Sequence, residues 1–343
     1  MAVQRPDRGI TVVSFSGIPV MRLLRREFFR LAAGALVVPV LSRSAWAQTT
    51  SRLVRLVVGF PPGSTNDTLA RLIGHWLQER LGQPFVIENR PGAGSNIATE
   101  MVARAPADGH TLLMAATSAA INATLYDKLS FNFIRDFAPI ASLLRQPHIM
   151  LVHPSLPVKT IPQFIAFAKA NPGKINMASS GNGTGPHMAG ELFKMMAKVD
   201  LVHVPYRGGA QALTDLLGGQ AQMMLPAPAA AMEYIRNGSL RPLGVTAGTR
   251  SETLPDVPAI SEFVPGYEAD TWFGIVAPRN TPAGIVDKLN KEINAGLADA
   301  TLRRRLDDLG GGAFPSTPAE FGKLIADDTE KWGQVVRAAG IKL

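Results

Sequence analysis

Leu53-Val-Arg-Leu-Val-Val-Gly-Phe60 is a short apolar run, and Pro61-Pro-Gly-Ser-Thr-Asn-Asp67 follows it directly. The run predicts a buried β-strand, and the Pro, Gly and Ser residues after it predict a loop. The next segment places apolar residues on one face of a helix, namely Leu69, Leu72, Ile73, Trp76 and Leu77. This strand–loop–helix order is the building unit of an α/β fold.

The same unit recurs along the rest of the chain. Further strands are predicted at residues 85–88, 111–115, 149–153, 174–179, 201–206, 240–246 and 272–277. Further helices are predicted at residues 161–169, 187–197, 210–217, 283–297 and 318–339. Such repetition predicts a mainly parallel sheet with helices on both faces. Residues 48–343 suffice for two α/β domains, and because no low-complexity linker divides them, we expect lobes between which the chain crosses.

The first 47 residues contain the three parts of a secretory signal. Arg25-Arg26 forms the basic region, residues 31–41 are apolar and uncharged, and Ala45-Trp-Ala47 is a cleavage site of the A-x-A type. The twin arginine favours the Tat variant, and the apolar run is shorter than the roughly 20 residues that span a bilayer. We therefore expect export to the periplasm with cleavage near Ala47. The alternatives are an N-terminal core helix and, for the start of the protein, Met21.

Charge and composition exclude several kinds of partner. The chain has 35 Lys and Arg against 27 Asp and Glu, but residues 1–47 carry seven of the Arg and two of the acids. The remaining residues therefore carry 28 basic and 25 acidic side chains, a net charge of +3, which indicates no nucleic-acid partner. The chain has no Cys, so disulfides and thiolate zinc sites are excluded. The His residues are scattered, and neither a metal site nor a cofactor is predicted.

Three connections from a strand into a helix are rich in small, hydroxyl or amide residues. They are residues 60–67, here called the first loop, residues 179–184, the second loop, and residues 206–209. The first turn of a helix has unpaired N–H groups and a partial positive charge, and Gly lets a ligand approach the backbone. With added hydroxyl donors these features form a carboxylate or phosphate site without Lys or Arg. The alternative is that the loops only cap their helices.

Motifs of catalysis and nucleotide binding are absent from the sequence. It contains no G-x-x-x-x-G-K-[ST], G-x-S-x-G or H-E-x-x-H motif, and residues 181–185 do not match G-x-G-x-x-G. Asp67 with Arg71 is predicted to be an i, i+4 helix pair and not a catalytic acid. No enzyme is therefore predicted. The alternative is an exported serine hydrolase that uses His187 or His203, which requires a Ser–His pair at roughly 3 Å.

Several motifs in the same order resemble the Bug receptors, the extracytoplasmic solute-binding proteins of tripartite tricarboxylate transporters. Phe60-Pro-Pro-Gly-Ser-Thr-Asn-Asp67 resembles their F-P-P-G-G-x-x-D loop. The match continues with Glu88-Asn-Arg-Pro-Gly-Ala-Gly94, Asp108-Gly-His-Thr-Leu-Leu113, Ser179-Ser-Gly-Asn-Gly-Thr184, Val202-His-Val-Pro-Tyr206 and Trp272-Phe-Gly-Ile-Val-Ala-Pro278. The resemblance covers residues 52–343.

The resemblance implies a two-lobed type II periplasmic-binding-protein fold of α/β structure, with a ligand cleft between the lobes. Residues 48–149 and 270–343 would form lobe 1, and residues 150–269 would form lobe 2. In the family the first and second loops face each other and hold a ligand carboxylate. The implied ligand-binding residues are Phe60, Ser64, Thr65, Asn66, Asp67, Ser179, Ser180, Asn182, Gly183, Thr184 and Tyr206. The implied function is that of a monomeric receptor that delivers a small organic carboxylate to a membrane permease pair or a sensor.

Two departures from the family pattern concern the pocket. Ser64 stands where the family has a second Gly, which adds a hydroxyl donor. Residues 225–230 are Leu-Pro-Ala-Pro-Ala-Ala, where the family carries a segment of F-D type that lines the cleft. This part of the pocket should therefore be more apolar, which favours a carboxylate with an apolar body over an amino acid, whose ammonium group would need an acid there.

Overall fold

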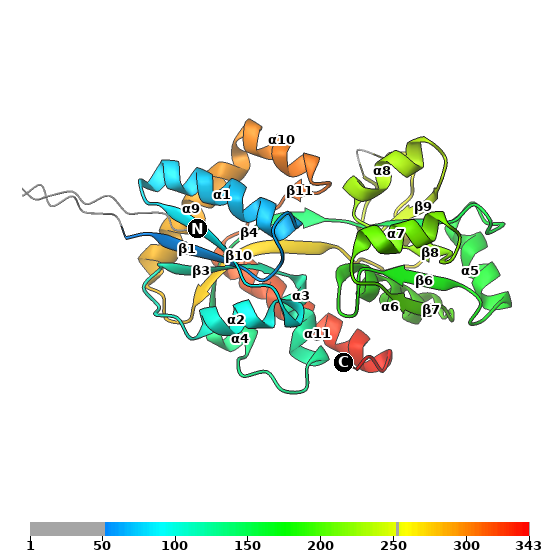
Figure 1. Ribbon diagram of the computed structural model, residues 1–343, viewed down its shortest axis with the longest axis horizontal. Helices are drawn as coiled ribbons and strands as arrows, with labels where there is room; N and C mark the ends of the chain where they lie inside the picture. The colour runs from blue at the N-terminus through cyan, green and yellow to red at the C-terminus, as the bar shows by residue number, and fades with distance from the viewer. Residues whose placement is uncertain (1–51, 252–253, 343) are drawn as a thin grey trace, which may run out of the picture. The chain divides into compact units, whose positions relative to one another are not determined.

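A computed structural model describes residues 52–251 and 254–342 of the chain. The predicted signal segment and its cleavage site lie outside these residues, so the prediction of export remains a prediction. Figure 1 shows the helices and strands of the described part.

One sheet has six strands in the order β11-β4-β10-β3-β1-β2 (Figure 1). Its strands are β1 (Val54–Val58), β2 (Phe85–Asn89), β3 (Thr111–Ala116), β4 (Phe137–Gln146), β10 (Thr271–Pro278) and β11 (Gly312–Ala313). β1 pairs in parallel with β2 and β3, whereas β10 pairs antiparallel with both β3 and β4. The segment that decides the fold, β1 with its following loop, thus lies inside the sheet between two parallel neighbours.

The second sheet has five strands in the order β7-β6-β8-β5-β9. Its strands are β5 (Ile149–Val152), β6 (Asn176–Ser179), β7 (Val202–Pro205), β8 (Met223–Met224) and β9 (Arg241–Val245). β6 pairs in parallel with β7 and β8, and β5 pairs antiparallel with β8 and β9.

Helices cover both faces of each sheet, as the apolar face of an amphipathic helix requires. They are α1 (Thr65–Leu81), α2 (Asn96–Ala103), α3 (Thr117–Leu125), α4 (Phe133–Asp136), α5 (Ile161–Ala170), α6 (Gly185–Ala197), α7 (Gly209–Leu217), α8 (Pro228–Arg236), α9 (Ala283–Ala298), α10 (Ala300–Asp308) and α11 (Pro318–Ala338). Two 3₁₀ turns, Ala93–Ser95 and Ile260–Glu262, complete the elements. On the six-stranded sheet α1, α9 and α10 share one apolar cluster, and α2, α3 and α11 belong to another. On the five-stranded sheet α5 and α6 lie in one cluster, and α7 and α8 in another.

The chain crosses between the sheets after β4 and again after β9. The backbone N–H of Thr246 donates to the carbonyl oxygen of His148 at 2.9 Å, and the N–H of His148 donates to Thr246 Oγ1 at 2.7 Å. β10 then pairs with β4, with Thr271 opposite Gln146. The two crossing segments therefore run side by side and are joined by hydrogen bonds.

The prediction of a mainly parallel sheet is wrong, because both sheets are mixed. The prediction followed the local strand–helix units, which do form the parallel pairs of β1 and β6. β10 returns to the six-stranded sheet from the other sheet and enters between β3 and β4, antiparallel to both. A strand that arrives from the other sheet is free of the crossover rule that makes a βαβ unit parallel.

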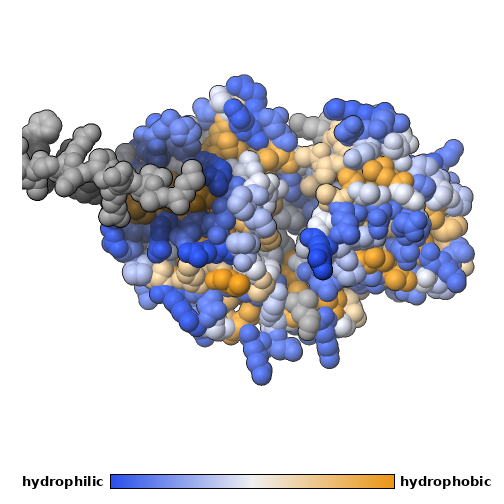
Figure 2. All heavy atoms as spheres, in the orientation of Figure 1, coloured by the Kyte–Doolittle hydropathy of each residue, from blue (hydrophilic) through white to orange (hydrophobic). Residues whose placement is uncertain are grey.

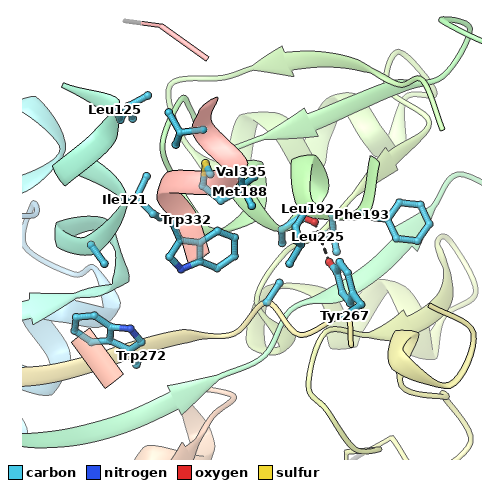
Figure 3. Packing of buried hydrophobic residues seen from close by; sticks show 14 of the residues in the cluster. Ile121, Leu125, Met188, Leu192, Phe193, Leu225, Tyr267, Trp272, Trp332 and Val335 are labelled. Atoms are coloured by element: carbon cyan, nitrogen blue, oxygen red, sulfur yellow. Dashed lines mark hydrogen bonds between the residues drawn. The ribbon is translucent and has the colours of Figure 1, made fainter. Parts of the chain in front are cut away.

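A continuous apolar cluster joins the helices of the two sheets. Trp332 and Val335 of α11 lie between Ile121 of α3 and Met188 of α6 in this cluster (Figure 3). In the same region the hydroxyl of Tyr267 donates to the carbonyl oxygen of Ala189 in α6 at 2.9 Å (Figure 3). The packing therefore fixes α6, and with it the end of the second loop, against the rest of the core.

The face drawn in Figure 2 is mostly polar. Figure 2 shows hydrophilic residues over most of the visible face, with hydrophobic residues in small separate patches. Within the described part of the chain, the helices are all too short or too polar to cross a membrane.

Candidate ligand-binding site

A pocket of about 470 Å³ lies where several helices begin. The N-terminal turns of α1, α3, α6, α7 and α8 all contribute to its lining. The first turn of each helix carries N–H groups that have no partner within the helix, and the helix dipole places partial positive charge there. The pocket is therefore suited to an anionic group.

The first loop is shaped by Gly63 and Ser64. Gly63 has φ +82°, a conformation that residues with a side chain rarely adopt. Ser64 is the N-cap of α1, and its hydroxyl accepts a hydrogen bond from the N–H of Asp67 at 3.3 Å. The N–H groups of Thr65 and Asn66 belong to the same helix turn, and both residues line the pocket.

Asp67 holds this loop from behind. Its carboxylate accepts hydrogen bonds from the Gly63 N–H at 2.9 Å, from Asn89 Nδ2 at 2.9 Å and from two nitrogens of Arg71 at 3.0 Å. Burial acts to raise the pKa of Asp67, but the hydrogen bonds from Arg71, Gly63 and Asn89 together hold that pKa below its ordinary value. The predicted i, i+4 pair of Asp67 and Arg71 is confirmed.

The second loop also depends on glycine. Gly181 has φ +124° and Gly183 has φ +72°. The hydroxyl of Thr184 donates to the carbonyl oxygen of Gly181 at 2.7 Å, and Thr184 is the N-cap of α6. Pro186 occupies the first turn of that helix, where its missing N–H costs nothing. These contacts fix the conformation of the loop, whose residues 182–184 line the pocket.

Two buried polar atoms on residues of the pocket lining have no hydrogen-bond partner within the described protein. They are Asn66 Oδ1 and Ser118 Oγ. A carboxamide can present either its oxygen or its nitrogen, and a hydroxyl can donate or accept. Because buried polar groups are nearly always paired in native proteins, these atoms mark where a bound polar ligand or water would be held.

The structure brings most of the predicted ligand-binding residues together. Eight of them line the pocket: Phe60, Ser64, Thr65, Asn66, Ser180, Asn182, Gly183 and Thr184. Asp67, Ser179 and Tyr206 are not among the described residues that line it. Asp67 and Ser179 support the two loops from inside, and Tyr206 directs its hydroxyl toward Asp215 on α7. Direct contact with a ligand stays a prediction for all eleven residues.

Sequence reasoning missed several lining residues. Thr117 and Ser118 begin α3 directly after β3, so the strand–hydroxyl–helix pattern of the first loop was also present there. His148 and Thr271 line the pocket as a hydrogen-bonded pair at 3.1 Å, although 123 positions separate them in the chain. No local pattern could have indicated that pair. Residues 225–230, which the sequence analysis expected to form an apolar wall, contribute Pro226, Ala227 and Ala230, and Met224 lines the pocket just before them.

The electrostatic character of the pocket comes from backbone and neutral side chains. Its ionisable lining residues, within the described chain, are Tyr126 and His148. Burial lowers the pKa of His148 to about 4, so the ring is neutral at ordinary pH. Across residues 52–251 and 254–342, acidic and His side chains form no cluster suited to a metal ion.

A Ser–His pair of the kind the hydrolase alternative requires is present. Ser179 Oγ lies 2.6 Å from His203 Nε2. However, Ser179 is fully buried, and its hydroxyl also accepts from the Gly181 N–H at 3.2 Å. A nucleophile must reach its substrate, and this hydroxyl is enclosed behind the second loop. Ser179 and His203 therefore stabilise the second loop.

These features define a class: an α/β protein of two sheets, with a pocket where helix N-termini converge. The family described as tripartite tricarboxylate transporter family receptor matches residues 69–341. Protein BugT of Bordetella pertussis is 34% identical over 296 residues, which are 85% of this chain and 91% of BugT. The chain belongs to this family of transporter receptors.

Solved structures agree with this assignment. R. palustris Rpa4515, solved with adipate, is 36% identical with a TM-score of 0.75 over 85% of this chain and 98% of that chain. MatC of Rhodopseudomonas palustris, solved with bound malate, is 34% identical with a TM-score of 0.71 over 83% of this chain and 99% of that chain. The predicted family and two-lobed fold are thereby confirmed, and the protein is a solute-binding receptor and not a hydrolase.

Proposed function

We propose that this protein is a periplasmic receptor that closes on a small organic carboxylate with an apolar body. It delivers this ligand to the membrane permease pair of a tripartite tricarboxylate transporter or presents it to a sensor. The observation that carries the proposal is the convergence of helix N-termini, including those that follow the first and second loops, on one pocket of about 470 Å³.

The anion would be held by neutral donors. Thr65 and Asn66 present their backbone N–H groups from α1, and Ser180 and Asn182 add side-chain donors from the second loop. Helix N-termini favour negative charge in this way without a Lys or Arg. The buried carboxamide of Asn66, whose oxygen has no partner in the described protein, would turn its NH₂ group to the ligand carboxylate.

The rest of the pocket favours an apolar ligand body. Phe60 and Phe273 line it together with Leu213, Met224 and Pro226. Burial of an apolar ligand surface against such side chains contributes roughly 25 cal/mol per Å² of area removed from water. An ammonium group would be placed here among helix N-termini of the same sign, and we expect amino acids to bind poorly.

Binding is proposed to close two lobes on the ligand. Lobe 1 is assigned to residues 48–149 and 270–343, and lobe 2 to residues 150–269. The hydrogen-bonded crossing segments around His148 and Thr246 would form the hinge, since a hinge confines its change of backbone angles to a few residues. We propose that the receptor acts as a monomer, and that residues 1–47 direct its export through the Tat route and are then cleaved near Ala47.

The ligands of similar proteins support the choice of ligand class. Rpa4515 was solved with adipate and MatC with malate, both of which are carboxylates. Their pockets belong to chains with about a third of their residues identical to this one. The departure at residues 225–230 is the reason to expect a different, more apolar ligand body here.

Thermal unfolding with a panel of ligands tests the proposal. The panel contains adipate, malate, a branched aliphatic acid, an aromatic acid and an amino acid, each with its neutral amide as a control. A ligand present at 100 times its Kd stabilises the folded state by about 2.7 kcal/mol, which raises the Tm by several degrees. We expect such a rise with carboxylates of apolar body and none with their amides. A Tm that stays constant across the whole panel would contradict the proposal.

A further inference from the structure

A buried polar cluster lies directly behind the second loop. It consists of Ser179 at the end of β6, His187 in the first turn of α6 and His203 on β7. The rings of His187 and His203 stack, with centroids 3.8 Å apart and an angle of 15° between their planes. Neither histidine lines the pocket within the described chain, so they contribute to ligand binding only through the loop.

His187 holds one glycine of the loop. Its Nδ1 accepts a hydrogen bond from the backbone N–H of Gly183 at 3.1 Å, and the ring is 2% exposed. α6 is itself fixed in the apolar core through Met188, Leu192 and Phe193 (Figure 3). His187 Nδ1 is therefore a fixed acceptor, and its hydrogen bond favours the orientation of the Gly183 N–H that goes with a φ of +72° at that residue.

His203 holds the other glycine through Ser179. His203 Nε2 lies 2.6 Å from Ser179 Oγ, and the same oxygen accepts from the N–H of Gly181 at 3.2 Å. Gly181 has φ +124°. The two stacked rings thus fix the two left-handed residues of one loop, one directly and one through a hydroxyl.

We propose that His187 and His203 are positioning residues, which as neutral rings hold the second loop in its ligand-binding form. The proposal rests on the proposed function, in that the loop is taken to bind the ligand anion. It adds that the affinity of the receptor depends on the ionisation of a pair of side chains that the ligand never touches.

The charges around the pair favour the neutral rings. His187 faces His203 from β7 and Glu191 from its own helix, where Glu191 Oε1 lies 3.8 Å from His187 Nε2. Lys194 Nζ pairs with Glu191 at 2.9 Å and so offsets that carboxylate. Burial, His203 and Lys194 lower the pKa of His187 to about 3, and burial and Lys194 lower the pKa of His203 to about 4.

The direction of the pH effect follows from these pKa values. A ring whose loop has come loose titrates near the ordinary value of 6.5, whereas the held ring stays neutral to about pH 3 or 4. The loose form therefore binds more protons below pH 6.5 and is favoured as the pH falls. A protonated His187 also loses the Nδ1 lone pair that accepts from Gly183. Affinity should stay constant above this pH and decline below it.

Two substitutions of His187 distinguish the effect of its hydrogen bond from the effect of its ring. His187→Asn retains an acceptor, because Asn Oδ1 occupies the place of His Nδ1, whereas His187→Phe retains a flat ring without an acceptor. His75→Gln is the matched control, because His75 lies on the exposed side of α1 with a side-chain exposure of 71%. Circular dichroism and the Tm establish that each variant is folded.

The first measurement needs no ligand. Amide hydrogen exchange at Gly183, followed by NMR on the purified protein, should accelerate by roughly tenfold or more in His187→Phe, because the donor loses its acceptor. The rate should stay near that of the unmodified protein in His187→Asn and in His75→Gln. Equal protection of Gly183 in the Phe and Asn variants would overturn the proposal, whether or not a ligand is known.

The second measurement uses the carboxylate that gives the largest rise in Tm, with its Kd followed from pH 8 to pH 4. The Kd of His187→Phe should be larger by roughly tenfold or more at pH 8, and the Kd of His187→Asn should be nearly unchanged. The double variant His187→Asn with His203→Gln contains neither ring, so its pH profile carries only the titrations that both proteins share, namely those of the ligand and of groups such as His148 in the pocket lining. The unmodified protein should weaken more steeply below pH 6.5 than this double variant. Identical profiles would refute the proposal while leaving carboxylate binding intact.

Discussion

Gly183 of the second loop lies directly against Leu125 of α3. A Cβ atom built on Gly183 would come within 2.4 Å of Leu125 Cδ2, which is closer than any real contact of this kind. Gly183 follows β6 of the five-stranded sheet, whereas α3 packs on the six-stranded sheet. The absence of a side chain at Gly183 is thus what allows the loop to approach the opposite wall of the pocket.

Gly183→Ala should weaken ligand binding by more than its backbone strain explains. The φ of +72° costs roughly 1–2 kcal/mol for any residue with a Cβ, and the contact with Leu125 adds a clash. Gly238→Ala is the matched control, because Gly238 has the same φ of +72° and open space around it. Isothermal titration should show a loss of affinity in the first variant only. Adding Leu125→Ala to Gly183→Ala should restore part of it, and a failure of this rescue would show that the clash is not the cause.

Asp67→Asn should loosen the first loop. The carboxylate joins Gly63, Asn89 and Arg71, and Asn cannot accept all of these hydrogen bonds. We expect a loss of about 1–3 kcal/mol in the free energy of unfolding and a weaker Kd for carboxylates. Because the folded pKa of Asp67 is below the ordinary 3.8, its contribution is complete above that pH and disappears as the pH falls further.

The control for Asp67 is another i, i+4 pair of a basic and an acidic residue. Asp327 pairs with Lys323 on α11, with both side chains more than half exposed. Exposed pairs of this kind contribute about 0.5 kcal/mol or less. Urea unfolding at pH 7 should therefore show a clearly larger loss in the free energy of unfolding for Asp67→Asn than for Asp327→Asn. Equal effects would assign Asp67 no special role in the loop.

The parts of the site that follow one strand could be predicted from the sequence. The first and second loops can be recognised from the sequence because each combines three local signals within about a dozen positions. These are a buried strand, residues suited to left-handed turns, and a helix with a cap. The strand at β1 and the helices at α1 and α6 were predicted to within a few residues. Local propensity and burial agree at these points, and such agreement is what makes a segment predictable.

The contacts between distant segments could not be predicted in this way. β4 was missed, because Pro139 and Arg145 interrupt its apolar pattern and its burial comes from pairing with β10. Similarly, nothing local shows which side chain of a loop faces the ligand. Ser179 and Asp67 have the residue types of ligand contacts, but their side chains accept hydrogen bonds from the N–H groups of Gly181 and Gly63 and support the loops.

Thr246→Val should destabilise the crossing between the sheets. Thr246 is fully buried, and its hydroxyl accepts from the His148 N–H at 2.7 Å and donates to Asp270 Oδ1 at 3.1 Å. Val has the same shape and leaves the buried N–H of His148 without an acceptor, which costs about 1–3 kcal/mol. Thr214→Val is the control, because that exposed hydroxyl bonds only within α7. Chemical denaturation should separate the two, and a change below about 0.5 kcal/mol at Thr246 would contradict the assigned role.

Ala227 permits a test of charge at the pocket wall with the fold held constant. It is the N-cap of α8, has an extended backbone (φ −65°, ψ 150°), makes no side-chain cap and lines the pocket. Asp and Asn are equally good N-caps, so either should stabilise the protein by about 1 kcal/mol. Ala227→Asp also adds a negative charge beside the ligand, which should weaken carboxylate binding by roughly tenfold or more. Ala227→Asn should raise the Tm without this loss, and equal affinities of the two variants would show that the wall does not face the anion.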